Sequence, residues 1–253
     1  MTFFRNVVFL AAAVGLFAGI SLAVLQTFAT VPLILQAETY EGAGASTHDH
    51  GTAAEPAAPA GDTHAVQTAG HDHDEGGWAP EDGFERTAFT ALANIVTATG
   101  FALLLVAASE LAGGIASWRA GMIWGFAGFA VFTLAPSLGL PPELPTMPAA
   151  DLLARQAWWI TTVVATAAGL AMIVFRGSPG VAAVGLALIL APHIIGAPQP
   201  VSHESMIPAD LHHRFVVAVT MTNLVFWVVL GAVTGWLRPR FLEAPRALHT
   251  RVA

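Results

Sequence analysis

The sequence RFVVAVTMTNLVFWVVLGAVTGWL, residues 214–237, begins with an arginine and then runs for 23 residues without another charged side chain. About 20 predominantly apolar residues are enough for a helix to span the hydrocarbon core of a bilayer. This segment therefore predicts a transmembrane helix, and the rest of the chain contains more of them. Five further segments satisfy the same criteria: residues 7–35, 88–112, 119–137, 157–175 and 179–197.

The composition of the whole chain supports a membrane protein. Hydrophobic residues make up 55% of the 253 residues and charged residues only 11%, and the mean hydropathy is +0.64. A soluble domain carries roughly a quarter charged residues, so this chain has too few to cover a surface in water. We predict an all-α, polytopic membrane helix bundle with about six transmembrane helices in three hairpins. Five spans is the alternative, because the third and fifth segments are short; the lipid bilayer is the expected partner, and no nucleic acid is.

The arginines indicate the orientation of the helices, since cytoplasmic loops are enriched in basic residues. With six spans, seven of the ten basic residues lie on one side, together with both termini. We therefore predict a protein of the bacterial inner membrane with cytoplasmic N- and C-termini. The first apolar segment is longer than the roughly 7–15 residues of a signal-peptide core, so we expect it to be retained, with cleavage as the alternative. The predicted divisions are a first transmembrane helix (1–37), a flexible His/Asp-rich periplasmic loop (38–86), a helical membrane core of about five spans (87–238) and an arginine-rich cytoplasmic tail (239–253).

The segment THDHGTAAEPAAPAGDTHAVQTAGHDHDEGG, residues 47–77, contains two His-Asp-His triplets and no Lys or Arg. This histidine-rich segment cannot bury enough apolar surface to fold alone. Neutral imidazole suits Co, Ni, Cu and Zn, and His-X-His in an extended chain places both rings on one side. We predict that the pairs His48/His50 and His71/His73 capture a divalent metal at the outer face, less tightly below the imidazole pKa of about 6.5. A solvated loop without a metal role is the alternative.

A second group of metal-ligating residue types lies in PHIIGAPQPVSHESMIPADLHHRF, residues 192–215. His193 follows a proline at the end of an otherwise apolar span, where a polar side chain needs a partner; a structurally satisfied histidine is the alternative. His212 and His213 point to different faces of the helix that follows, so not all members of the group can face one ion. The candidate metal ligands here are His193, His203, Glu204, His212 and His213, with Asp210 as a transport-path candidate.

Two proline-containing turns resemble each other. LAPSLGLPPELP (134–145), the first elbow, and LAPHIIGAPQP (190–200), the second elbow, both carry an apolar span through Ala-Pro into a Gly/Pro-rich turn. Proline in a helix leaves a carbonyl without its donor, and in a membrane such a group must be satisfied by protein, water or an ion. The elbows therefore indicate a polar cavity at the outer face, with simple surface loops as the alternative.

Polar and aromatic residues at the ends of spans have both structural and functional interpretations. Glu110 ends the second span near the predicted cytoplasmic face, where it is either an interfacial residue or an exit-side ligand or proton carrier. Glu143 follows the first elbow and lies close in sequence to Arg155, so an ion pair is the alternative to metal binding. Trp158 and Trp159 begin the fourth span, where an aromatic belt is expected.

The sequence resembles the CbtA family, which is predicted to supply a cobalt transporter subunit in bacteria. The resemblance is carried by APSLGLPPELP (135–145), RQAWW (155–159), APHIIGAP (191–198), PADLHHRF (208–215) and NLVFW (223–227). It implies an inner-membrane protein linked to cobalt, usually described with about five spans. It also implies a small single-span, histidine-rich protein partner, CbtB-like.

The expected function is uptake of a divalent late transition metal, most directly Co²⁺, with Ni²⁺ and Zn²⁺ as alternatives. Cysteine is absent, so thiolate ligands are excluded, and the chain lacks the G-x-x-x-x-G-K-[ST] motif of a nucleotide site. A non-transporting metal sensor or storage protein is the second hypothesis. A membrane oxidoreductase is less favoured because haem would need paired intramembrane histidines, and only His193 lies in or near a span. We therefore expect no enzyme activity and no tightly bound cofactor.

Overall fold

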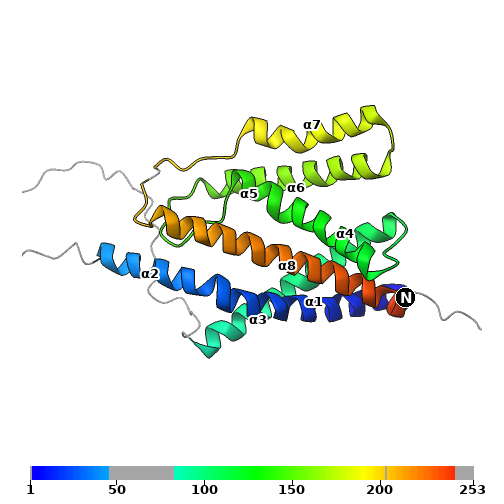
Figure 1. Cartoon of the computed structure of the whole chain (residues 1–253), viewed down its shortest axis with the longest axis horizontal. Coiled ribbons are helices and arrows are strands. Elements are labelled where there is room, and N and C mark those ends of the chain that lie inside the picture. The colour runs from blue at the N-terminus through cyan, green and yellow to red at the C-terminus, as the bar shows by residue number, and fades with distance from the viewer. Residues whose placement is uncertain (1, 46–82, 203, 243–253) are drawn as a thin grey trace, which may run out of the picture.

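The computed structural model describes residues 2–45, 83–202 and 204–242, which form helices and connecting turns with no strand among them (Figure 1). The all-α prediction is therefore confirmed. Five helical stretches in this part are long and apolar enough to cross a membrane. The helices are α1 (Thr2–Ala29), α2 (Val31–Ala45), α3 (Phe84–Leu111), α4 (Trp118–Phe129), the π-helix η1 (Ala130–Leu134), α5 (Ala135–Gly139), α6 (Leu152–Phe175), α7 (Pro179–Ile195) and α8 (Ala209–Leu242).

The third and fifth predicted spans are the short ones, as expected. The continuous stretch α4–η1–α5 has 22 residues, and α7 has 17. At about 1.5 Å per residue α7 is roughly 25 Å long, which is slightly less than the hydrocarbon core of about 30 Å. The described part thus contains five long spans and one short apolar helix that runs antiparallel to α6 (Figure 1).

The chain enters and leaves the bundle at the same end. The side-chain amide of Asn6 donates a hydrogen bond to the carbonyl oxygen of Phe241 at 2.9 Å, which joins the start of α1 to the end of α8. We call this the arginine end, and the opposite end, where the two elbows lie, the elbow end (Figure 1). The described arginines of the arginine end are Arg5, Arg119, Arg176, Arg238 and Arg240.

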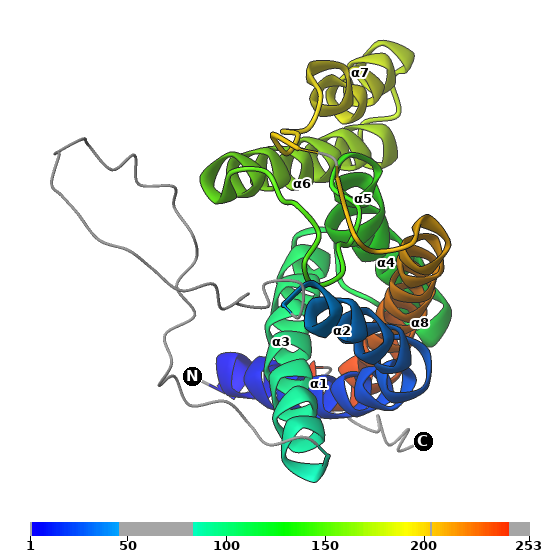
Figure 2. The ribbon, with the colours of Figure 1, turned by 90° about the vertical axis from the view of Figure 1, so that its left-hand side faces the viewer.

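The helices do not pack in three consecutive hairpins. The first pair, α1 with α3, packs as predicted, but α7 packs mainly on α6, while α8 packs on α4 and α1. Glycines explain the pairing of α4 with α8, because a Cβ on Gly121 or Gly231 would collide with the backbone of the other. Small residues allow such close approach of membrane helices. The result is a four-helix core of α1, α3, α4 and α8, with the α6–α7 hairpin beside it (Figure 2).

Prolines mark the departures from regular helix. Pro136 cannot donate to the carbonyl of Phe132 four residues earlier, and the helix widens into η1, where the N–H of Ala135 bonds the carbonyl of Ala130 five residues back. The first predicted helix is interrupted at Thr30, two residues before Pro32, and then continues as α2 to Ala45, beyond the predicted boundary at 37.

A second apolar cluster supports the elbow end. It joins α2, the end of the first elbow and the start of α8, and it is separate from the main core. An ion pair of 2.9 Å between Glu38 and Arg86 also joins α2 to the start of α3. The ion pair thus connects the helix that precedes residues 46–82 to the helix that follows them. The buried members of the cluster are Leu33, Ala37, Leu144, Ile207, Leu211 and Phe215.

Candidate functional site

Trp158 of α6 joins the two elbows at the elbow end, which faces the viewer in Figure 2. Only 9% of this residue is exposed, and its indole N–H donates a hydrogen bond to the carbonyl of Pro192 in the second elbow, at 3.2 Å. Gly139 of the first elbow lies against the indole, where a Cβ would collide with the ring carbon Cη2 of Trp158. A single buried side chain therefore brings together the ends of α5 and α7.

His193 lies beside this junction, in the last turn of α7. Its half-buried imidazole contacts Trp158 edge to face, with ring centroids 5.8 Å apart and planes at 74°. The geometry lies in the range that aromatic pairs prefer. His193 is therefore a borderline-soft nitrogen donor at the elbow end of the bundle, in a helix turn that contains a proline.

Glu143 forms an ion pair with an arginine side chain. Its carboxylate forms a 2.9 Å ion pair with Arg155, and the two side chains are 24% and 30% exposed. Both line an open groove of about 540 Å³ together with Gln156 and Trp159. The ion-pair interpretation of Glu143 is thus the one that the geometry supports, and a metal ion would have to displace Arg155 to reach this carboxylate.

The second histidine group does not converge. His212 is half-buried, and its Nε2 lies 3.0 Å from the carbonyl oxygen of Pro142, which connects α8 to the first elbow. His213 is exposed on another face, as expected for adjacent helical residues, and Glu204 and Asp210 are also exposed. In the part of the chain that the structure describes, no three His, Cys, Asp or Glu side chains come close enough to hold a metal ion. His48, His50, His71, His73 and His203 lie outside the described residues.

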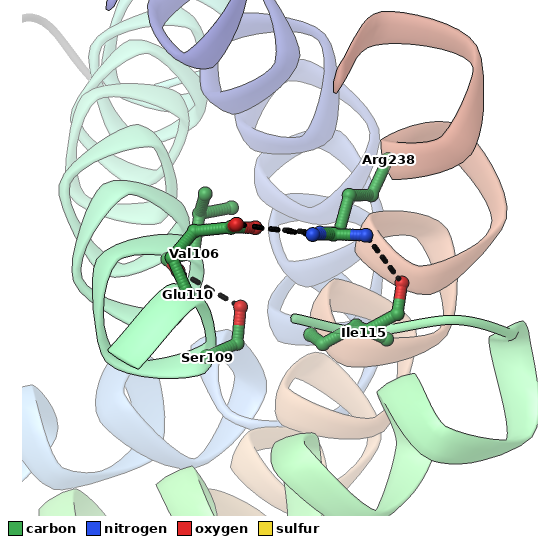
Figure 3. A network of polar contacts seen from close by, with 5 residues as sticks. All are labelled: Val106, Ser109, Glu110, Ile115 and Arg238. Atoms are coloured by element: carbon green, nitrogen blue, oxygen red, sulfur yellow. Dashed lines mark hydrogen bonds and ion pairs between the residues drawn. The ribbon is translucent and has the colours of Figure 1, made fainter. Parts of the chain in front are cut away.

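Glu110 belongs to an ion-paired cluster at the arginine end (Figure 3). Its two carboxylate oxygens accept hydrogen bonds from Nε and Nη2 of Arg238, at 2.6 and 3.0 Å. Arg238 also donates to the carbonyl of Ile115 at 3.3 Å, and its side chain is 12% exposed against 27% for Glu110. Gly114 leaves room for the guanidinium, because a Cβ there would collide with it. The geometry supports a structural clamp between α3, the following loop and α8.

A family model described as "Probable cobalt transporter subunit (CbtA)" matches residues 4–238. The chain belongs to the CbtA family. The match covers every helix from α1 to α8 except the first two residues of α1 and the last four of α8, and it includes both elbows. No curated protein and no solved structure matches the chain. CbtA membership and the apolar helices together identify a multi-pass membrane protein of a cobalt transporter family.

Two residues of this CbtA protein are more important in the structure than the sequence indicates. The sequence places Trp158 in an aromatic belt, but it is buried, whereas Trp159 is 37% exposed and fits the belt. Arg238 stands out in the sequence only as a basic residue of the arginine end, although it is the partner of Glu110. Sequence signals mark both places: the prolines of the two elbows lie near Trp158, and the Ser109-Glu110 pair before Gly113-Gly114 lies near Arg238.

Proposed function

We propose that this CbtA protein is the membrane subunit through which a divalent late transition metal enters the cell, with Co²⁺ as the principal ion. The observation that carries the proposal is the fixed imidazole of His193 where the two elbows meet. Imidazole binds Co²⁺, Ni²⁺ and Zn²⁺ well and the hard ions Mg²⁺ and Ca²⁺ poorly. The family description supports cobalt among the first three.

The charge distribution supports entry from the elbow end. The arginine end corresponds to the cytoplasm by the positive-inside rule, so the elbow end is the periplasmic face of the inner membrane. Carboxylates outnumber arginines among the described residues there, and the exposed Glu204 and Asp210 contribute to this excess. Clefts of one charge sign concentrate ions of the other, which favours approach of a cation to His193.

The histidine-rich segment is the proposed capture element. Because Glu38 and Arg86 pair on either side of residues 46–82, the chain enters and leaves this stretch at the proposed periplasmic face. The pairs His48/His50 and His71/His73 then raise the local concentration of metal, and His193 receives the ion. A small single-span, histidine-rich protein is the proposed partner.

The membrane potential is a sufficient driving force. A potential of 100 mV contributes about 2.3 kcal/mol per elementary charge, hence about 4.6 kcal/mol for a divalent cation that moves to the negative side. This free energy sustains a concentration ratio of roughly two thousand. The proposed transport therefore needs no nucleotide site in this chain.

Uptake of radioactive cobalt by cells that lack other cobalt importers tests the proposal. The chain is expressed alone and with its proposed partner, and His193→Ala is compared with Gln199→Ala, a change at an exposed polar residue of the same elbow. We expect His193→Ala to lower uptake at limiting Co²⁺ and Gln199→Ala to leave it near the wild-type rate. Equal uptake by wild type and His193→Ala would show that His193 is not part of the ion path. Metal binding without uptake in any combination would instead identify a sensor or storage protein.

A further inference from the structure

The last turn of α7 lacks some of the backbone hydrogen bonds that stabilise a regular helix. Pro192 has no N–H, so the carbonyl of Leu188 loses its usual donor, and the final carbonyls of any helix have no partner within it. Gly196 ends the helix with a positive φ of 90° and donates its N–H to the carbonyl of Pro192 at 3.0 Å. His193 lies between these two residues, so its position depends on how this turn is held.

The indole N–H of Trp158 supplies the second hydrogen bond to the same carbonyl, at 3.2 Å. A carbonyl oxygen has two lone pairs, and both are now used. This carbonyl belongs to the planar peptide unit that links Pro192 to His193, so fixing the oxygen also fixes the plane from which the His193 side chain begins. The same indole then contacts the imidazole ring itself at 5.8 Å.

Trp158 is itself buried and lies against the first elbow. Gly139 packs against its ring, with Ala197 close by, and the hydroxyl of Thr162 donates to the backbone carbonyl of Trp158 at 2.9 Å. With 9% of the residue exposed, the indole has little freedom to turn. The indole bonds the carbonyl of Pro192, in the peptide unit just before His193, and it also contacts the imidazole ring. These two contacts together restrict the orientations that the imidazole can take.

We propose that Trp158 is the positioning residue of the metal site: it orients the imidazole of His193 toward ions that arrive at the elbow end, and Gly139 keeps the space that this arrangement needs. The inference rests on the proposed function, in which His193 binds the transported ion. In this proposal Trp158 binds no metal itself, but it sets the affinity of His193 for the ion.

Trp158→Phe is the decisive substitution, because it keeps a ring and removes the N–H. Trp159→Phe is the matched control, since Trp159 contacts Phe132 at 6.4 Å instead. In Co²⁺ uptake we expect Trp158→Phe to raise the apparent KM about five-fold, the equivalent of one net hydrogen bond of about 1 kcal/mol. The maximal rate per protein molecule in the membrane should stay unchanged, as it should for the control. A lower maximal rate with an unchanged KM would mean that Trp158 serves folding alone, and would overturn the inference.

The double variant Trp158→Phe/His193→Ala separates positioning from an independent effect. Positioning predicts that it behaves like His193→Ala alone, because Trp158 then has nothing left to orient. A further five-fold rise in KM over His193→Ala would contradict the inference. Gly139→Ala is a second perturbation, which displaces the indole without removing its N–H, and it should raise KM in the same direction.

A spectroscopic measurement distinguishes failure of this inference from failure of the proposed function. In the full-length protein in nanodiscs, the ring signals of His193 are identified by their loss in His193→Gln. We expect them to shift in Trp158→Phe and to stay in place in Trp159→Phe. If His193→Ala leaves uptake unchanged, the proposed function fails, whereas unshifted His193 signals in Trp158→Phe would refute the positioning role itself.

Discussion

Removal of the charge at Glu110 should destabilise the protein without abolishing transport. Arg238 is 12% exposed and forms a two-point contact with Glu110 at 2.6 and 3.0 Å. Glu110→Gln keeps the shape of the side chain and leaves the guanidinium with a neutral partner. Breaking a buried ion pair by changing one partner costs about 3–5 kcal/mol, and the partial exposure of Glu110 puts the expected loss near the lower limit, about 3 kcal/mol.

Arg238→Met should lower the free energy of unfolding by less than Glu110→Gln does, about 2 kcal/mol. The reason is that the carboxylate of Glu110 is 27% exposed and can be rehydrated. The double variant should lose less stability than Glu110→Gln alone, because neither charge is then left without its partner. Arg240→Met is the control, since Arg240 is exposed and stacks on Trp236. It should change stability by less than about 0.5 kcal/mol.

Thermal unfolding of the purified protein, followed by tryptophan fluorescence, measures these differences. At about 2–4 °C per kcal/mol for a chain of this size, Glu110→Gln should lower Tm by about 6–12 °C. Cobalt uptake per folded molecule should remain within about two-fold of wild type. A two-fold change corresponds to about 0.4 kcal/mol, which is small beside the expected loss of stability. An unchanged Tm with uptake reduced ten-fold or more would refute the clamp and restore Glu110 as an exit-side ligand.

Three further predictions concern other parts of the molecule. Deletion of residues 47–77 should lower uptake at scarce Co²⁺ and spare it at high Co²⁺, as measured over a concentration series, whereas a sensor would lose its response at every concentration. Gly231→Ala should lower Tm by several degrees because its Cβ would collide with Gly121, while Gly100→Ala, with open space around it, should have little effect. A cysteine at Ser202, in a chain without cysteine, should react with an impermeant maleimide from the periplasm. Protection of this cysteine would contradict the proposed six-span orientation.

Hydropathy is sufficient to predict where the spans lie but not which of them touch. Long apolar runs look alike on any scale, so the helices can be found from the sequence while their partners cannot. The pairing of α4 with α8 depends on where Gly121 and Gly231 fall around each helix, and on backbone contact across more than a hundred residues of chain. The sequence suggests that glycines such as Gly231 allow close packing, but it carries no information about the partner.

The candidate site can be predicted only in part for the same reason. His193 and the elbows are recognisable locally, because a histidine and a proline at the end of an apolar run are unusual in themselves. Trp158 cannot be recognised in this way, because the aromatic belt already explains a tryptophan near the start of a predicted span. Only the burial of Trp158 in the structure contradicts that explanation. The partner of Glu110 lies 128 residues away, and a long-range ion pair leaves no local pattern.

The four-helix core and the α6–α7 hairpin differ in how firmly they are joined to their neighbours, and this difference bears on the proposed route of the ion. At the arginine end, Glu110, Arg238 and the backbone of Ile115 join α3 to α8, and the glycine contacts of α4 and α8 fix the core beside them. The α6–α7 hairpin is attached differently, since it meets the rest of the described chain mainly through α6 against η1 and α5. That contact includes a π-helix and a proline, where backbone hydrogen bonding is already irregular. The proposed path for the ion would therefore require least disruption between this hairpin and the core. Trp158, which contacts both His193 and Gly139, lies at the elbow end of that boundary.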